Sequence, residues 1–181
     1  MRPSYISNFI TDPGLTRLIE EVPWIRMTET RSESMMASNF VSYTYGKGRG
    51  ERTYTSSPFC AGVEEVMNAV NLHLDLSNAM LNVCFLNRYD NEREHLGWHS
   101  DDHHGTDHTR PIAVVSFGEA REIWWRKFGQ SGEVPLECRQ RLGNGSLFIM
   151  PPGFQDYYQH RIPKGDRSMG PRISLTFRSF I

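Results

Sequence analysis

The stretch Trp98-His99-Ser100-Asp101-Asp102 places an imidazole and a carboxylate two residues apart, with a second carboxylate directly after them. On an extended strand, residues i and i+2 point to the same face, so His99 and Asp101 are predicted to converge. His160, in a distant segment, is the candidate third ligand. Two histidines and one carboxylate leave coordination positions open and suit non-haem Fe(II) in oxygen chemistry. Because a lone His-x-Asp often arises by chance, this prediction depends on the rest of the chain.

The chain after residue 80 indicates a series of short strands separated by glycine and proline turns. About eight strands at this spacing predict a jelly roll (double-stranded β-helix), a mainly β fold with flanking helices. The strands are expected at residues 81–89, 98–101, 112–117, 122–125, 139–142, 146–150, 157–162 and 172–177. Further upstream, residues 28–42 are interpreted as a polar region, followed by a strand at 42–45.

Two helices are expected before this series of strands. Asp12 suits an N-cap and Pro13 the first helical position of a short helix that ends near Pro23. Ser57-Pro58 is expected to start a longer helix, in which apolar residues recur at three- and four-residue steps as far as Leu74. This amphipathic pattern predicts that the longer helix packs on a sheet.

Composition bounds the class of protein. The 181 residues are 38% hydrophobic and 23% charged, which indicates a globular chain, interpreted as one domain over residues 1–181. No signal peptide is expected, because Met1-Arg2-Pro3 leads into a polar segment. The three cysteines are odd in number and show no Cys-x-x-Cys pair, which favours reduced thiols. We expect a monomer in the cytoplasm, or in the nucleus if the source is eukaryotic.

Charge is distributed unevenly, although the net charge is only −1. Residues 87–120 carry three Lys or Arg against seven Asp or Glu, and residues 121–181 carry ten against five. This pattern fits an acidic metal-binding segment beside a basic surface, or ordinary surface variation. The loop at residues 46–50 is either a basic loop that grips phosphates or a plain hairpin connection.

The last expected strand alternates strictly between two kinds of side chain. Ile173, Leu175 and Phe177 are predicted to face the core, which leaves Arg172 and Arg178 on the opposite face. The two arginines lie six residues apart, or roughly 20 Å at ~3.3 Å per residue. If both side chains lean inward, the remaining gap is about the span of a small dicarboxylate, and guanidinium groups bind carboxylates bidentately. The alternative is two solvated arginines on an edge strand.

Asn87 and Tyr89 share one face of the expected strand at 81–89. An amide and a phenol there could add hydrogen bonds to the same anion. The alternative is a pair of surface residues before a turn.

Taken in order, these segments resemble the AlkB family of Fe(II)- and 2-oxoglutarate-dependent dioxygenases, which remove alkyl groups from nucleic acid bases. The resemblance is strong over about residues 81–181 and weak over the N-terminal third. The matching motifs are Trp98–Asp102, Ser116-Phe117-Gly118, Gly145–Met150, Gln155–Lys164 and Pro171–Arg178.

The resemblance implies a role for each matching residue. Fe(II) would be held by His99, Asp101 and His160, and 2-oxoglutarate by Asn87, Tyr89, Arg172 and Arg178. Asp102 would test the exocyclic amino group of a flipped base, and Tyr54 and Tyr45 would belong to the base pocket. Residues 1–80 would then form the nucleotide-recognition region and residues 81–181 the jelly-roll core. The implied reaction is oxidative demethylation of DNA or RNA with O₂, which releases an aldehyde, succinate and CO₂.

Two positions depart from the family pattern, and both concern substrate choice. Ser56 stands where close relatives have an aromatic residue that stacks on the base, and Phe40, Tyr43 or Tyr45 would have to replace it. His103 stands where an acidic residue often follows the second Asp.

Three other functions remain open. One is a zinc site, built from ligands among His99, Asp101, His103, His104, Asp107 and His108. Another is a non-catalytic jelly-roll binding module. The third is an oxygenase that acts on a protein, a lipid or a small molecule.

Overall fold

A computed structural model describes residues 1–11, 14–45, 51–76, 81–103 and 105–181, without the side chains of Tyr43 and Tyr45. The helices in this part of the chain are α1 (Leu15–Glu21), α2 (Ala61–His73) and α3 (Phe154–Tyr157), with a 3₁₀ turn at Leu136–Cys138. The strands are β1 (Ser4–Ile6), β2 (Ile25–Thr28), β3 (Arg31–Ala37), β4 (Ser42–Tyr45), β5 (Arg52–Thr55), β6 (Val83–Tyr89), β7 (Leu96–His99), β8 (Ile112–Gly118), β9 (Arg121–Lys127), β10 (Arg139–Leu142), β11 (Ser146–Met150), β12 (Tyr158–Ile162) and β13 (Arg172–Arg178).

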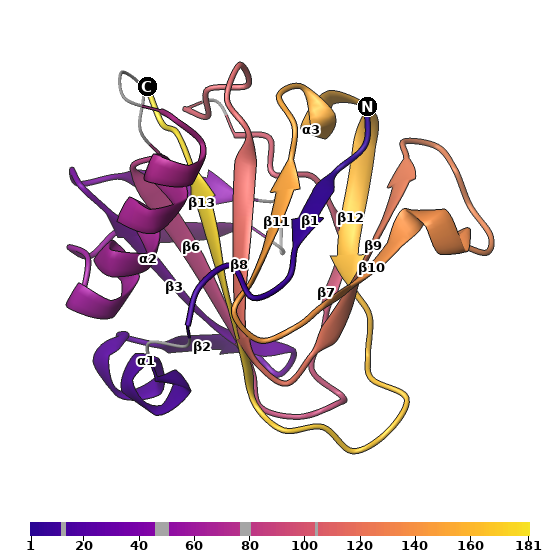
Figure 1. Ribbon diagram of the computed structural model, residues 1–181, viewed down its shortest axis with the longest axis horizontal. Helices are drawn as coiled ribbons and strands as arrows, with labels where there is room; N and C mark the ends of the chain where they lie inside the picture. The colour runs from indigo at the N-terminus through magenta and orange to yellow at the C-terminus, as the bar shows by residue number, and fades with distance from the viewer. Residues whose placement is uncertain (12–13, 46–50, 77–80, 104) are drawn as a thin grey trace.

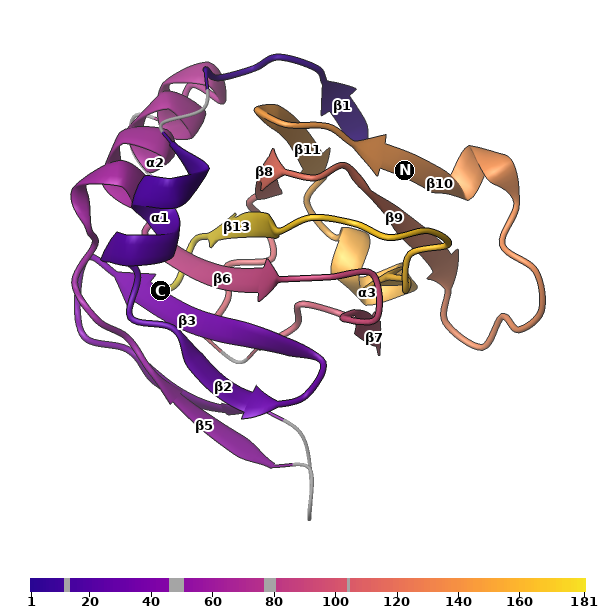
Figure 2. The same cartoon turned by 90° about the horizontal axis from the view of Figure 1, so that it is seen from below.

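The described strands pair into two larger sheets and one ribbon (Figure 1). The larger sheet has the order β1-β11-β8-β13-β6-β3-β2, the smaller sheet has the order β10-β9-β12-β7, and β4 pairs with β5. Figure 2 shows α1 and α2 on one side of the larger sheet, with β9 and β7 on its other side. Two antiparallel sheets with helices on one outer face form a jelly roll, which confirms the predicted fold class.

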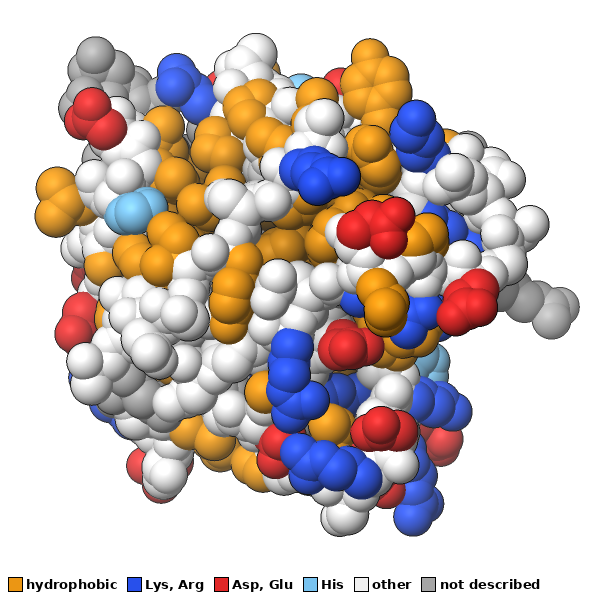
Figure 3. Space-filling view, turned by 45° about the vertical axis from the view of Figure 1, so that its right-hand side comes forward, with side chains coloured by type: hydrophobic (Ala, Val, Ile, Leu, Met, Phe, Trp, Pro, Cys, Tyr) orange, Lys and Arg blue, Asp and Glu red, His pale blue; other side chains and the backbone are white. Residues whose placement is uncertain are grey.

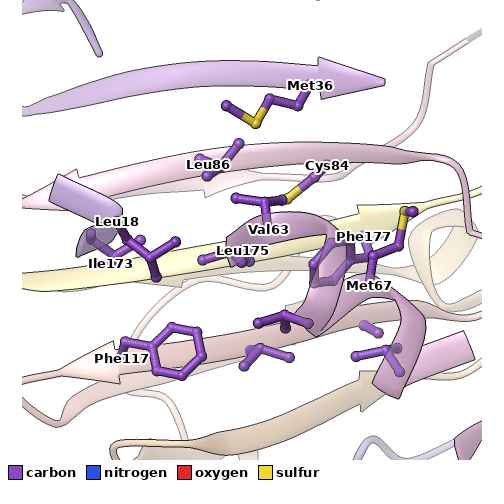
Figure 4. Packing of buried hydrophobic residues seen from close by; sticks show 14 of the residues in the cluster. Leu18, Met36, Val63, Met67, Cys84, Leu86, Phe117, Ile173, Leu175 and Phe177 are labelled. Atoms are coloured by element: carbon purple, nitrogen blue, oxygen red, sulfur yellow. The ribbon is translucent and has the colours of Figure 1, made fainter. Parts of the chain in front are cut away.

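β13 lies at the centre of the larger sheet, between β8 and β6. Its apolar residues Ile173, Leu175 and Phe177 pack in one cluster with Leu18 of α1 and Val63 of α2 (Figure 4). Every residue of the strand is buried. The alternative of two solvated arginines on an edge strand is therefore wrong: Arg172 and Arg178 lie on a central strand and face the smaller sheet.

Several predicted boundaries were wrong in the N-terminal half. β3 is a strand in the region expected to be merely polar, and it pairs with β6 over six residue pairs. α2 begins at Ala61 rather than at Pro58, because the N–H of Ser57 donates to the Met35 carbonyl and its carbonyl accepts from Ala37. The predicted cap at Asp12-Pro13 lies outside the described residues. No helix in the described part of the chain is long and apolar enough to cross a membrane.

Candidate active site

The three predicted ligands converge between the sheets. His99 of β7 and His160 of β12 stand opposite each other in the smaller sheet, and their ring centroids are 4.2 Å apart. Asp101 follows the end of β7, with its Oδ1 3.6 Å from His99 Nε2 and its Oδ2 3.5 Å from His160 Nε2. One ligand atom from each residue lies within 4.8 Å of the others. The expected strand at 98–101 ends early, so Asp101 reaches the site from beyond the strand.

A β-bulge in β7 sets the direction of the His99 ring. Leu96 pairs with Ile162 and His99 with His160, so three residue steps on β7 oppose two on β12. A bulge of this kind redirects side chains beside active sites. His99 Nδ1 lies 2.9 Å from the carbonyl oxygen of Gly97 in the bulge. Because a carbonyl only accepts, Nδ1 carries the proton and Nε2 is left as the ligand atom.

Two contacts hold Asp101 in place. Its backbone N–H donates to Gln155 Oε1 at 2.9 Å, and Gln155 Nε2 in turn donates to Met150 Sδ at 3.3 Å. Arg178 donates to Asp101 Oδ1 at 2.6 Å through one terminal nitrogen. Buried hydrogen bonds to charged groups are short and strong, so the carboxylate has one fixed orientation.

The buried environment sets the protonation states of two ligands. Burial lowers the pKa of His99 to about 3, and the neighbouring His160 ring acts in the same direction. Burial alone would raise the pKa of Asp101, but the Arg178 guanidinium and the two imidazoles lower it below its usual range. His99 is therefore neutral and Asp101 ionised near pH 7, which are the forms that bind metals.

The donor set fits Fe(II) better than the larger zinc cluster considered above. Two imidazole nitrogens and one carboxylate form a facial set, and Nε2 of each histidine lies within 3.6 Å of an Asp101 carboxylate oxygen. Of the other candidate zinc ligands, His103 stacks on Phe180 at 5.6 Å, and His108 pairs with Asp156 at 3.2 Å. Among the described residues only the triad forms a metal-binding group. His104 lies outside them.

Arg172 is a buried cation at another part of the same cavity. The side chain is 0% exposed, and one terminal nitrogen donates to Ser116 Oγ at 2.9 Å. Its Nε and other terminal nitrogen find no hydrogen-bond acceptor in the described residues. Burial lowers its pKa to about 10, partly countered by Tyr89, so it stays charged near pH 7. A buried cation with unused donors fits an anionic ligand.

The cavity continues along the inner face of β13 from Arg172 to Arg178. Ser174 and Thr176 line it between the two arginines, and Asn87 of β6 lies beside Ser174. The guanidinium of Arg172 lies over the Tyr89 ring, 5.5 Å from its centroid. The structure therefore brings all four predicted 2-oxoglutarate residues to the cavity that the metal triad lines: Asn87, Tyr89, Arg172 and Arg178.

A polar network on β3 extends this cavity, and the sequence interpretation missed it. Arg31 Nε donates to Asn87 Oδ1 at 2.7 Å, and another nitrogen of Arg31 donates to Glu33. The hydroxyl of Tyr54 donates to the same Glu33 oxygen at 3.2 Å. Tyr54 also packs edge-on against Phe85, with ring centroids 4.9 Å apart. A polar stretch gave no strand signal, because these buried side chains point into a cavity rather than an apolar core.

The predicted base-reading residues have different positions. Asp102 is exposed, lines the cavity and accepts a hydrogen bond from Ser100 Oγ at 3.0 Å. Tyr54 is buried, 7% exposed, and also lines the cavity. Tyr45 ends β4, and its side chain lies outside the described structure. Gln155 and Ser116 support the site directly, although the sequence interpretation gave them no role beyond a motif.

Comparison with known proteins agrees with this geometry. The profile of the 2OG-Fe(II) oxygenase superfamily matches residues 4–178. The DNA oxidative demethylase ALKBH2 of Mus musculus is 32% identical over 133 residues, covering 71% of this chain and 54% of the relative. The alpha-ketoglutarate-dependent dioxygenase alkB homolog 3 is 30% identical over 187 residues in Bos taurus and 29% in Homo sapiens, covering 98% of this chain and 64% of each relative.

These relatives are longer than the chain, which spans less than two thirds of their length. The superfamily profile, in contrast, covers nearly the whole sequence, including the triad and both arginines of β13. The chain therefore belongs to the 2OG-Fe(II) oxygenase superfamily, and within it to the AlkB family, whose members use Fe(II), 2-oxoglutarate and O₂.

Proposed function

We propose that the chain oxidatively demethylates N-alkylated bases in DNA or RNA, consuming 2-oxoglutarate and O₂ and releasing an aldehyde, succinate and CO₂. One observation carries this proposal: a single cavity is lined by the His99–Asp101–His160 triad, by two buried arginines and by an exposed carboxylate at Asp102. The names of the longer relatives, a DNA oxidative demethylase among them, support nucleic acid as the substrate class.

The triad residues would hold Fe(II), which together with 2-oxoglutarate and O₂ supplies the power to oxidise a C–H bond. The protein contributes the geometry. The Gly97 carbonyl keeps His99 Nε2 directed at the site, and Gln155 and Arg178 keep Asp101 in its orientation. Fixing ligands from behind in this way tunes metal affinity and avoids reorganisation during the reaction.

Arg172 and Arg178 would bind the two carboxylates of 2-oxoglutarate. Arg178 already contacts Asp101, so it lies at the metal end of the cavity, and Arg172 lies six residues away on the same strand. Asn87 and Tyr89 would add contacts beside Arg172. Since the unused donors of Arg172 are buried, a carboxylate there would relieve an unpaired polar group as well as a charge.

Asp102 and Tyr54, with Tyr45, would recognise the base. An ionised carboxylate accepts hydrogen bonds and donates none, so Asp102 favours bases that present an amino or iminium donor. Those bases include N1-methyladenine and N3-methylcytosine, whereas N3-methylthymine presents carbonyl groups. The hydroxyl of Tyr54 donates to Glu33, and both residues line the cavity, so this hydrogen bond fixes the phenol there.

The proposal also covers the state of the protein in the cell. We infer one domain over residues 1–181, with residues 1–80 contributing base recognition and residues 81–181 the jelly-roll core. We infer a monomer in the cytoplasm, or in the nucleus of a eukaryote, in line with free thiols at Cys60, Cys84 and Cys138.

The test measures two products over a panel of methylated DNA and RNA oligonucleotides. Formaldehyde and succinate should form together, only with Fe(II), and neither should form in His160→Ala. Succinate without formaldehyde on every oligonucleotide would redirect the substrate to a protein or a small molecule. Metal binding without any turnover of 2-oxoglutarate would favour the binding module.

A further inference from the structure

A row of arginine and tryptophan side chains crosses the outer face of the smaller sheet. We call Arg126, Trp98, Arg161, Trp124 and Arg139, in this order, the Arg/Trp ladder. The Arg126 guanidinium lies 4.1 Å and that of Arg161 4.9 Å from the centroid of Trp98. Arg161 and Arg139 each lie 4.4 Å from the centroid of Trp124. Each indole is therefore contacted by two cations.

Strand pairing builds the ladder. Arg139 of β10 pairs with Trp124 of β9, and Trp124 pairs with Arg161 of β12. The bulge in β7 places Trp98 beside Arg161, while His99 turns toward the metal site. β7 is the edge strand of its sheet. Trp98 of the ladder is one residue from the candidate metal ligand His99, and its side chain lies on the opposite face of β7.

The charges of the ladder are not balanced within the described chain. Arg139 already has partners within the chain: it donates to the carbonyl of Val134, and one of its terminal nitrogens lies 3.5 Å from Glu133. Arg126 and Arg161, in contrast, form no ion pair with any residue that the structure describes, and the buried Nε of each has no hydrogen-bond partner there. Glu122 accepts a hydrogen bond from Trp124 Nε1 at 2.6 Å, but no ion pair joins Arg126 or Arg161 to an acid among the described residues. These two like charges near one indole favour the approach of an anion.

The chemistry of the ladder suits phosphate groups. Guanidinium forks match phosphate geometry, and stacking on indoles holds them in fixed orientations. Since guanidinium groups already cover the indoles, the ladder offers hydrogen-bond donors rather than rings on which bases could stack. Figure 3 shows that Lys and Arg side chains also gather on the lower part of one face of the molecule, interspersed with acidic ones.

We propose that Arg126 and Arg161 bind backbone phosphates of the nucleic acid strand whose methylated base occupies the cavity. This inference rests on the proposed function and adds the path of the strand. A strand that leaves the cavity past Asp102 crosses the β7 edge and meets Trp98 and the two unpaired guanidinium groups.

The test compares the wild type with Arg126→Gln/Arg161→Gln, by fluorescence anisotropy with a single-stranded oligonucleotide that contains N3-methylcytosine, over a series of salt concentrations. Counterion release predicts that the slope of log affinity against log salt falls by about 1.4, at about 0.7 per lost phosphate contact on a single strand. kcat/KM should fall further on the long oligonucleotide than on a methylated trinucleotide, which offers the ladder fewer backbone phosphates.

Two controls separate binding from structure. Arg139→Gln removes the same charge from the same ladder, but Arg139 is already bound to the Val134 carbonyl and lies beside Glu133, so the salt slope should stay near the wild-type value. Arg126→Lys/Arg161→Lys keeps the charges and loses the planar stack, so it should retain most of the slope.

Each other outcome overturns the proposal. An unchanged slope in the Gln pair would leave the ladder to an acidic protein partner or to structure alone. A Lys pair that loses binding and thermal stability as far as the Gln pair would make the ladder structural. If either of these two outcomes is found while the wild type still demethylates the oligonucleotides, only this inference fails and the proposed function stands. If the wild type neither binds nor demethylates any oligonucleotide, the proposed function fails with it.

Discussion

At the scale of the residue, the two arginines of β13 have different tasks although they share a strand face. Arg178 donates to Asp101 of the triad, whereas Arg172 donates to Ser116, lies over the Tyr89 ring and keeps two nitrogens without a hydrogen-bond partner in the described residues. In the proposed site, Arg178 would therefore serve both the metal and the cosubstrate, and Arg172 the cosubstrate alone. Lysine substitutions can separate these tasks, because lysine keeps the charge and loses the fork.

Arg172→Lys should raise the KM for 2-oxoglutarate roughly 10- to 100-fold, since hydrogen bonds to charged groups contribute about 1.5–3 kcal/mol. Its affinity for Mn(II), measured by calorimetry without 2-oxoglutarate, should equal that of the wild type. Arg178→Lys should weaken both, because Asp101 loses its orienting partner. If Arg178→Lys bound Mn(II) like the wild type, the contact with Asp101 would have no part in holding the metal.

The substitution Asp102→Asn distinguishes a role of Asp102 in base recognition from a purely structural role. Asp102→Asn should keep metal and 2-oxoglutarate binding, since the Asp102 side chain accepts a hydrogen bond from Ser100, which is not one of the residues proposed to hold either ligand. It should lower kcat/KM on N3-methylcytosine about tenfold or more, by the loss of a charged hydrogen bond, and narrow the preference over N3-methylthymine. The measurement is the ratio of the two kcat/KM values in one oligonucleotide context. An unchanged ratio would move base readout to Tyr54 and its neighbours.

At the scale of the element, turns fix where β13 begins and β8 ends. Gly118 has a φ of +88°, and a Cβ there would lie 2.3 Å from the carbonyl oxygen of Pro171. Gly118→Ala should therefore cost more than the roughly 1–3 kcal/mol of backbone strain alone. Urea unfolding of this variant should be compared with Gly170→Ala, where a Cβ meets nothing within 4 Å. Equal stability of the two variants would contradict the close approach.

Local patterns predicted some elements well and others poorly. β13 was predictable because Ile173, Leu175 and Phe177 alternate with polar residues, and α2 because its apolar residues follow the helical period. β3 was missed because Ser32 and Glu33 are polar and yet buried. The bulge in β7 was also missed, since it is set by pairing with β12, more than 60 residues away. The grouping of His99, Asp101 and His160 was predicted in spite of these errors, because that prediction depended on residue types rather than on the limits of the strands.

At the scale of the whole molecule, the site joins the two sheets. His99 and His160 belong to the smaller sheet, and Arg172 and Arg178 to the larger one. A metal and a dicarboxylate bound together should thus stabilise the sandwich as a unit. A ligand at a free concentration of a hundred times its Kd adds about 2.7 kcal/mol to the free energy of unfolding.

Thermal unfolding with Mn(II) and 2-oxoglutarate, each alone and both together, measures this effect. The wild type should gain most with both ligands. Arg172→Lys should keep the gain from Mn(II) alone and lose most of the further gain from 2-oxoglutarate. A gain from 2-oxoglutarate that was the same in both proteins would place the cosubstrate elsewhere.

The ion pair between Arg178 and Asp101 has a consequence for how the protein is made. In many small metal-binding domains the ligands repel one another or stay unpaired until the ion arrives, so the apo chain is unfolded. Here the buried carboxylate has a cation supplied by the chain itself, 2.6 Å away. We therefore expect the newly synthesised polypeptide to reach its native state before it acquires iron. Maturation then depends on the supply of the ion to a finished protein and not on its presence at the ribosome.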